Sequence, residues 1–254
     1  MRFSTSGLSF VVGLAALYVS GCGQETVEER SAAQKDTATY STAEAALRLP
    51  PSLEKRRGEF DETIRAAQRR IREFAEKHTW ERHTAESFMD SALLFDVKKD
   101  FDRTLLRISG SDTSIVLPET YCAALENRTL MAVSPELYAR VYPEGIEDHS
   151  YEKLLTHEIA HRLHIRILSG DENAMGPMWF YEGFALYAAD QLKNSDHALS
   201  TEELWRVVGD STRGGYAGYA YVFRHFASKA PLQELVNRAS DTDFTDWLHG
   251  LDIK

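Results

Sequence analysis

Cysteine is scarce in this chain, and long apolar runs are missing from it. Two cysteines among 254 residues exclude a disulfide scaffold and a cysteine-rich zinc module. No apolar run reaches the roughly 18 residues that a membrane-spanning helix needs. Basic residues are outnumbered, because 29 Lys and Arg stand against 39 Asp and Glu, so we expect no nucleic-acid partner. The 43% of hydrophobic residues is enough for a folded core.

The N-terminus has the pattern of an export signal. Arg2 is the only charged residue before Glu25, and an apolar stretch runs from Leu8 to Val19. This stretch has the length of a signal-peptide core and is too short to span a bilayer. It ends in the letters V-S-G-C at residues 19–22, which resemble a bacterial lipobox.

The lipobox resemblance implies cleavage before Cys22 and a lipid on Cys22. The protein would then be anchored in the bacterial cell envelope, and Gly23 favours the outer membrane, facing the periplasm, in a Gram-negative cell. An ordinary signal peptide is the alternative. With Cys22 lipidated, Cys122 would be buried, reactive or paired between chains. A Cys22–Cys122 disulfide is the other interpretation.

Composition divides the mature chain into a tether and one domain. Residues 1–21 are the predicted signal peptide. Residues 22–48 contain few large apolar side chains and are predicted to be a flexible tether. Residues 49–254 form the predicted catalytic domain.

A helix is predicted from Leu53 to about His78. Its apolar residues recur at intervals of three and four, which places them on one face. They are Phe60, Ile64, Ala67, Ile71 and Phe74. The arginines at 65, 69, 70 and 72 lie largely off this stripe, and we interpret them as a solvated face, with contact to anionic lipid as the alternative.

Short strands are predicted at 104–109, 113–117 and 128–133, with turn residues at 110–112. After Ser150 the pattern is helical to the end of the chain. Strands followed by helices indicate an α+β fold.

Residues 157–161 read H-E-I-A-H, inside a segment with helical apolar spacing. On a helix, His157 and His161 are one turn apart on one face and can bind one metal ion. Glu158 lies about 100° around the helix, where it can reach a metal-bound water. Two solvent-facing histidines on an ordinary helix are the alternative.

The residues that follow distinguish between zinc-enzyme classes. A metzincin needs Gly at 164 and His at 167, whereas this chain has His164 and Ile167. Residues 179–187 instead read W-F-Y-E-G-F-A-L-Y. This W-x-x-E-G-x-A pattern resembles gluzincins, especially peptidase-MA-like domains. The resemblance implies a zincin-like fold and Glu182 as the third zinc ligand beside His157 and His161.

The resemblance also implies accessory features. Aminopeptidase-N-like enzymes carry an oxyanion-stabilising tyrosine on a later helix. Tyr216 matches it best, with Tyr219 or a purely structural aromatic face as alternatives. An edge strand before the zinc helix binds substrate backbone in gluzincins, and Thr129–Ser134 is expected there. The G-x-M-E-N motif is missing, so the resemblance implies no aminopeptidase specificity and is closer to the small peptidase-MA-like domains.

Two positions near the motifs remain open. His164 shares the face of His157 and His161, and we interpret it as a core or supporting histidine rather than as a ligand. The group that orients the zinc histidines is unassigned, with Asp190 or backbone carbonyls as candidates.

These observations predict a zinc metallopeptidase of the endopeptidase kind, which holds one zinc ion and acts on a peptide or protein substrate. Glu158 would be its general base. One alternative is a catalytically inactive zinc-binding envelope lipoprotein that acts as a scaffold. Another is a metal-dependent hydrolase of non-peptide bonds.

Overall fold

The structure is a computed structural model that describes residues 45–212 and 214–252. The predicted signal peptide, Cys22 and most of the predicted tether lie outside the described residues. Within the described part, no helix is both long and apolar enough to cross a membrane. The last residues assigned to the tether belong to the fold, because Ala46–Arg48 forms strand β1.

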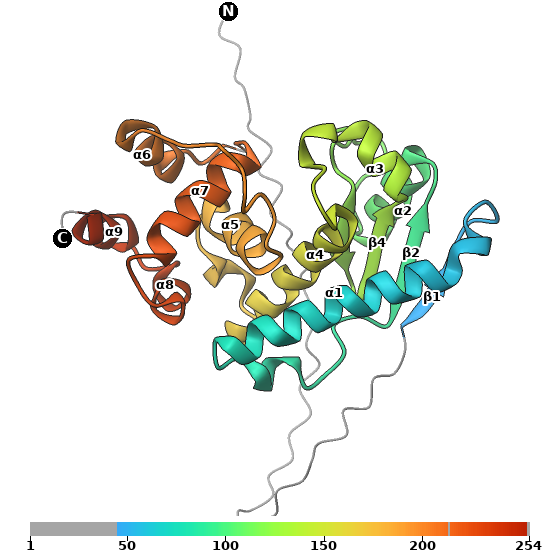
Figure 1. The fold of residues 1–254 in the computed structure, drawn as a ribbon, viewed down its shortest axis with the longest axis horizontal. Helices are drawn as coiled ribbons and strands as arrows, with labels where there is room; N and C mark the ends of the chain where they lie inside the picture. Colours follow the sequence, from blue (N-terminus) through green and yellow to red (C-terminus); the bar gives the residue numbers. More distant parts are fainter. Residues whose placement is uncertain (1–44, 213, 253–254) are drawn as a thin grey trace, which may run out of the picture. The chain divides into compact units, whose positions relative to one another are not determined.

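A four-stranded sheet and a larger helical part make up the fold, which confirms the predicted α+β class (Figure 1). The strands are β1, β2 (Ser91–Phe95), β3 (Ala123–Glu126) and β4 (Thr129–Val133). The helices are α1 (Arg57–Lys77), α2 (Lys98–Ile108), α3 (Pro135–Val141), α4 (Ser150–Ile167), α5 (Met178–Ala188), α6 (Thr201–Gly209), α7 (Tyr216–Ala227), α8 (Leu232–Arg238) and α9 (Phe244–Asp252).

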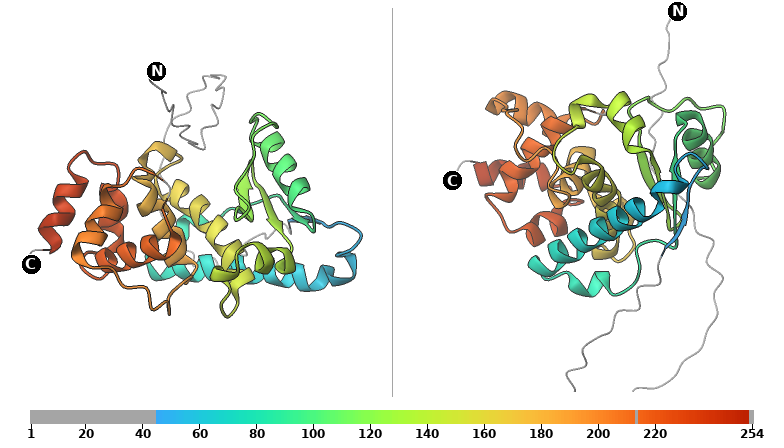
Figure 2. Two further views of the ribbon diagram at one scale, coloured as in Figure 1. Left: turned by 90° about the horizontal axis from the view of Figure 1, so that it is seen from above. Right: turned by 45° about the vertical axis from the view of Figure 1, so that its right-hand side comes forward.

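The sheet has the order β1-β2-β4-β3, with β3 antiparallel and the other neighbours parallel. Leu130, Met131, Ala132 and Val133 of β4 are all buried, so both faces of the sheet are covered. Helix α4 packs against β3 and β4, and α2 packs against β2, β3 and β4. The views in Figure 2 show the strands between these two helices.

Strand β4 confirms the strand predicted at 128–133, but it is not the edge strand that we expected at Thr129–Ser134. It pairs with β2 on one side and with β3 on the other. The edge beside α4 is β3, which joins β4 through Asn127 and Arg128. Both of these residues have positive φ, 46° and 59°, as a two-residue hairpin turn requires.

The strands predicted at 104–109 and 113–117 are wrong. The first segment belongs to α2, whose buried residues Phe101, Leu105 and Leu106 lie on one helical face. Gly110, at φ 69°, ends this helix. The backbone N–H groups of Gly110 and Ser111 donate to Arg107 and Leu106, which is a helix C-cap and not a hairpin turn. The second segment is irregular, and Val116 is 92% exposed.

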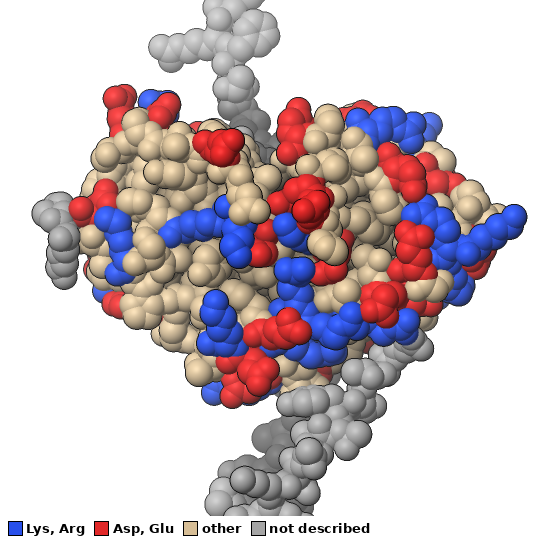
Figure 3. All heavy atoms as spheres, viewed as in Figure 1, with Lys and Arg blue, Asp and Glu red and all other residues tan. Residues whose placement is uncertain are grey.

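Helix α1 confirms the predicted amphipathic helix, since Phe60, Ile64, Ala67 and Ile71 are buried and Phe74 is half-buried. Its arginines have acidic neighbours. Arg65 and Arg69 pair with Glu62, and Arg70 pairs with Glu152. Acidic and basic side chains are accordingly mixed over this part of the surface (Figure 3).

The helices predicted after Ser150 are present as α4 to α9. Helix α5 packs against α4 on one side and against α7 on the other. Gly183 permits the close approach to α7, because a Cβ at this position would lie 2.7 Å from Cβ of Phe223. This contact explains the glycine that follows Glu182 in the sequence motif.

Candidate metal centre

Helices α4 and α5 bring three predicted ligands together. His157 and His161 lie one turn apart on α4, and Glu182 lies on α5. The two Nε2 atoms are 3.1 Å apart. Glu182 Oε2 is 3.2 Å from Nε2 of His157 and 3.6 Å from Nε2 of His161. In the described part of the chain, these residues form a group able to hold a metal ion.

The spacing of these atoms fits a small tetrahedral ion. Bonds of about 2.0–2.2 Å to nitrogen and oxygen place tetrahedral ligand atoms roughly 3.3–3.5 Å apart. The three observed separations, 3.1, 3.2 and 3.6 Å, lie around these values. His157 is 5% exposed and Glu182 is 6% exposed. Buried charges in proteins are paired or bind metal ions, so the donor set suits a cation.

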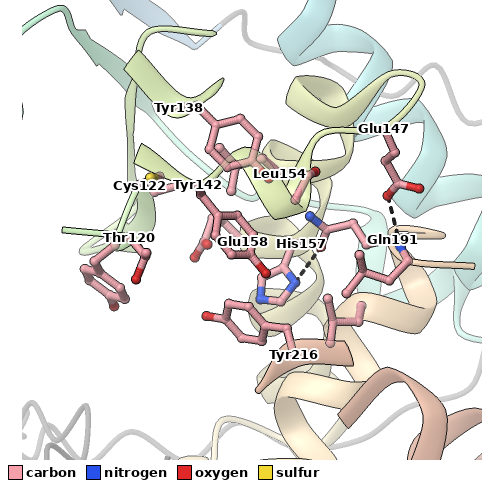
Figure 4. A pocket seen from close by; sticks show the side chains of 15 residues that line it. Thr120, Cys122, Tyr138, Tyr142, Glu147, Leu154, His157, Glu158, Gln191 and Tyr216 are labelled. Carbon is pink, nitrogen blue, oxygen red and sulfur yellow. Dashed lines mark hydrogen bonds between the residues drawn. The ribbon is translucent and has the colours of Figure 1, made fainter. Parts of the chain in front are cut away.

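Gln191 determines which nitrogen of His157 faces this cluster. Its side-chain Oε1 lies 2.9 Å from Nδ1 of His157 (Figure 4). A carbonyl oxygen only accepts hydrogen bonds, so Nδ1 carries the hydrogen. In the neutral ring, Nε2 then presents its lone pair to His161 and Glu182, as a metal ligand must.

The segment that carries Gln191 is held from two sides. Asp190 and Leu192 have positive φ, 58° and 52°, which is uncommon for residues other than glycine. Arg224 donates to the backbone carbonyls of Gln191 and Leu192, and Glu147 accepts from the N–H of Leu192 at 3.0 Å. Asp190, the side chain proposed for the orienting role, instead pairs with Lys193.

Glu182 remains ionised despite its burial. Burial opposes the charge, but the interactions with the adjacent imidazoles of His157 and His161 outweigh it, so the pKa of the carboxyl lies below its usual range. An ionised carboxylate is the form that binds a metal ion.

Glu158 lies beside the cluster rather than in it. It is half-buried, and it lines a pocket together with His157 (Figure 4). This position follows from the helix, which turns the residue after His157 away from the ligand face. The carboxylate of Glu158 therefore lies at the pocket and outside the three grouped side chains.

The tyrosines of α7 divide into two environments. The ring of Tyr216 lies 5.9 Å from the ring of His157 and lines the same pocket as Glu158. The hydroxyl of Tyr219 accepts a hydrogen bond from the N–H of Gly214 and donates to the carbonyl of Thr212 at 3.4 Å. Tyr219 therefore fastens the loop before α7, and Tyr216 is the tyrosine at the site.

His164 belongs to the core. It is 0% exposed and stacks on Phe184 with ring centroids 4.4 Å apart. Within the described residues, neither ring nitrogen has a hydrogen-bond partner. Burial lowers the pKa of His164 to about 3. The ring is neutral and is not among the grouped ligand atoms, as interpreted from the sequence.

Cys122 is a buried free thiol. Burial raises its pKa to about 12, which keeps it protonated and unreactive. It is 4% exposed, in line with the interpretation of a small core residue.

Comparison with known proteins identifies no relative. No family model matches the chain, and neither the curated proteins nor the solved structures include a match. The functional conclusion therefore depends on the geometry of the site and on the sequence motifs.

Proposed function

We propose that this chain is a zinc-dependent metallopeptidase of the gluzincin type, with a zincin-like fold. The observation that carries the proposal is the convergence of His157, His161 and Glu182, with Glu158 beside them. Two histidines and one glutamate are the ligands of a catalytic zinc site, which keeps a position for water. The helix–loop–helix arrangement and the adjacent edge strand support the resemblance.

When bound, zinc lowers the pKa of a water molecule to about 7 and polarises a carbonyl oxygen. Glu158 accepts the proton of the attacking water and delivers it to the leaving amine. Tyr216 donates its hydroxyl hydrogen to the oxygen on which negative charge develops. Strand β3 holds the substrate backbone along its open edge, because it pairs with β4 on its other side.

The same proposal includes an envelope location. The lipobox-like residues 19–22 would place a lipid on Cys22 and attach the protein to the membrane. A Cys22→Ser variant should move from the membrane fraction to the soluble fraction of cells. Wild-type protein found in the soluble periplasmic fraction would contradict the anchor.

The catalytic proposal is tested by metal analysis and a peptide-library digest. Purified protein should contain about one zinc per chain, as a His₂Glu site does. A chelator should abolish cleavage, and added zinc should restore it. An undigested library with a fully loaded zinc site would favour the scaffold alternative. Cleavage that survives complete metal removal would reject the proposal.

A further inference from the structure

A pocket adjoins the metal centre on the side of His157 and Glu158. Its walls come from the segment before and into β3, from α3 and the residues after it, from the N-terminal half of α4, from the end of α5 and the residues after it, and from the start of α7. His161 and Glu182 do not line it. Figure 4 shows the rings of Tyr138, Tyr142 and Tyr216 around this space. A side chain close to a bond held at the metal would enter here.

The walls are mainly apolar or aromatic. Leu154, Leu186 and Leu192 contribute aliphatic surface. The ring of Tyr142 lies 6.1 Å from that of Tyr138 and 6.4 Å from that of Tyr216. Burial raises the pKa of Tyr138 and of Tyr142, so both rings are uncharged at neutral pH. Such walls suit a large apolar side chain.

Of the two acids in this lining, Glu158 is the proposed base beside the metal site, and Glu147 already has partners. Glu147 Oε2 lies 3.0 Å from Nζ of Lys153, and Oε1 accepts from the N–H of Leu192. A basic substrate side chain would have to displace Lys153. An acidic one would meet the charge of Glu147. Burial of an unpaired charge is unfavourable, so both are disfavoured.

The aromatic wall is closely packed. A Cβ at Gly145 would lie 2.2 Å from the ring of Tyr142 and 2.9 Å from the hydroxyl of Tyr138. That hydroxyl donates to the carbonyl of Gly145 at 3.4 Å. The backbone at Gly145 thus passes directly against the two rings, which holds them in place before any substrate arrives.

We propose that this pocket is a specificity subsite that takes one large, uncharged aliphatic or aromatic side chain of a peptide, next to the bond that is cleaved. The proposal rests on the peptidase function proposed above and adds its substrate class. Tyr142 is its principal specificity-determining residue, since it contacts both other rings.

Binding to a Glu158→Gln protein tests the subsite without turnover. The probes are capped peptides Ala-Ala-X-Ala-Ala, in which X is Ala, Leu, Phe, Lys or Glu, and calorimetry on zinc-loaded protein measures the affinity. Because X is the only residue of the peptide that differs from Ala, the peptide can bind in whichever register places X in the pocket. Phe and Leu peptides should bind about 10- to 100-fold more tightly than the Ala peptide. Lys and Glu peptides should bind no more tightly than Ala.

Two variants link this preference to the pocket. Tyr142→Ala should reduce the ratio of Phe to Ala affinity by about threefold or more. Thr120→Trp alters an exposed residue of the lining, so the core stays intact. The larger Trp side chain should block the pocket and reduce the same ratio. Tyr221→Ala is the matched control, because Tyr221 is half-buried on α7 and does not line the pocket.

The outcomes separate the two proposals. Equal affinity for Phe and Ala peptides, a preference for Lys or Glu, or a ratio unchanged in both pocket variants would overturn the subsite. A retained Phe preference in a protein whose wild type cleaves no peptide would instead reject the peptidase function and leave the subsite standing.

Discussion

Oε1 of Gln191 lies 2.9 Å from Nδ1 of His157, and this contact turns the other nitrogen of the ring toward Glu182. Gln191 is buried, 34 residues from His157 in sequence. Gln191 orients the ring of His157, and it lies outside both the H-E-x-x-H motif and the W-x-x-E-G-x-A motif. Its backbone is fixed by Arg224 of α7, so α4, α7 and the segment after α5 all contribute to the position of His157.

Replacement of Gln191 by Leu should weaken zinc binding by about 10- to 100-fold, as loss of such supporting contacts does. The ring of His157 would lose the acceptor that selects its tautomer. Competition with a chromophoric chelator measures the affinity. Gln68→Leu is the control, since Gln68 bonds Arg72 on α1. Unchanged affinity in Gln191→Leu would show that packing alone orients the histidine.

Glu182→Ala should lose most of the bound zinc, because it removes one of three protein ligands. Glu126→Gln should retain it. Glu126 is a half-buried acid, with its pKa raised by burial, and it is outside the cluster. Metal content of the two purified variants is the measurement. Full zinc content in Glu182→Ala would reject the gluzincin assignment and reopen His164 as a ligand.

His164 makes the folded state sensitive to acid. Its pKa is about 3 in the fold and about 6.5 in the unfolded chain. As the pH falls below 6.5, the unfolded chain binds a proton that the folded chain does not. The free energy of unfolding should therefore decrease by about 1.4 kcal/mol per pH unit from this residue, down to about pH 3.

Urea unfolding at pH 7 and pH 5, with chelator present, measures this effect. The difference between the two pH values should be smaller in His164→Leu than in wild type, since the other titrating groups are common to both proteins. An equal pH dependence of the two proteins would mean that His164 is protonated or hydrated in the fold.

Gly183→Ala should reduce the free energy of unfolding by about 1–3 kcal/mol, the usual effect of overpacking. The added Cβ would press on Phe223 and separate α5 from α7. Gly58→Ala on α1 is the matched control, because its Cβ would meet nothing within 4 Å, so the helix should be unaffected or stabilised. Equal thermal stability of the two variants would contradict the close helix contact.

Local patterns predicted much of the site. The α1 stripe, strand β4 and the shared face of His157 and His161 follow from spacing within single elements, and spacing is what a sequence displays directly. The expectation that Glu182 joins them came from the family resemblance. Gln191 could not be predicted in this way. It lies in an irregular segment after α5, where Asp190 and Leu192 have a left-handed backbone conformation. No periodic pattern in the sequence marks a residue in such a segment.

The errors in the sheet have a similar origin. Over the six residues 104–109, apolar spacing does not distinguish a strand from a helix, and the preceding Phe101 completes the helical face. The hairpin between β3 and β4 uses Asn127 and Arg128 rather than the usual Asn-Gly. Strand β3 was therefore missed, and β4 was assigned to the edge.

Turnover by the Glu158→Gln variant tests the central claim most directly. Gln keeps the size of Glu158 but does not accept a proton at neutral pH, and it leaves the three ligands in place. The variant should retain its fold and its zinc, while kcat/KM on a cleaved peptide falls by about 10²-fold or more, the usual contribution of a general base. Wild-type activity in a zinc-loaded Glu158→Gln protein would contradict the account.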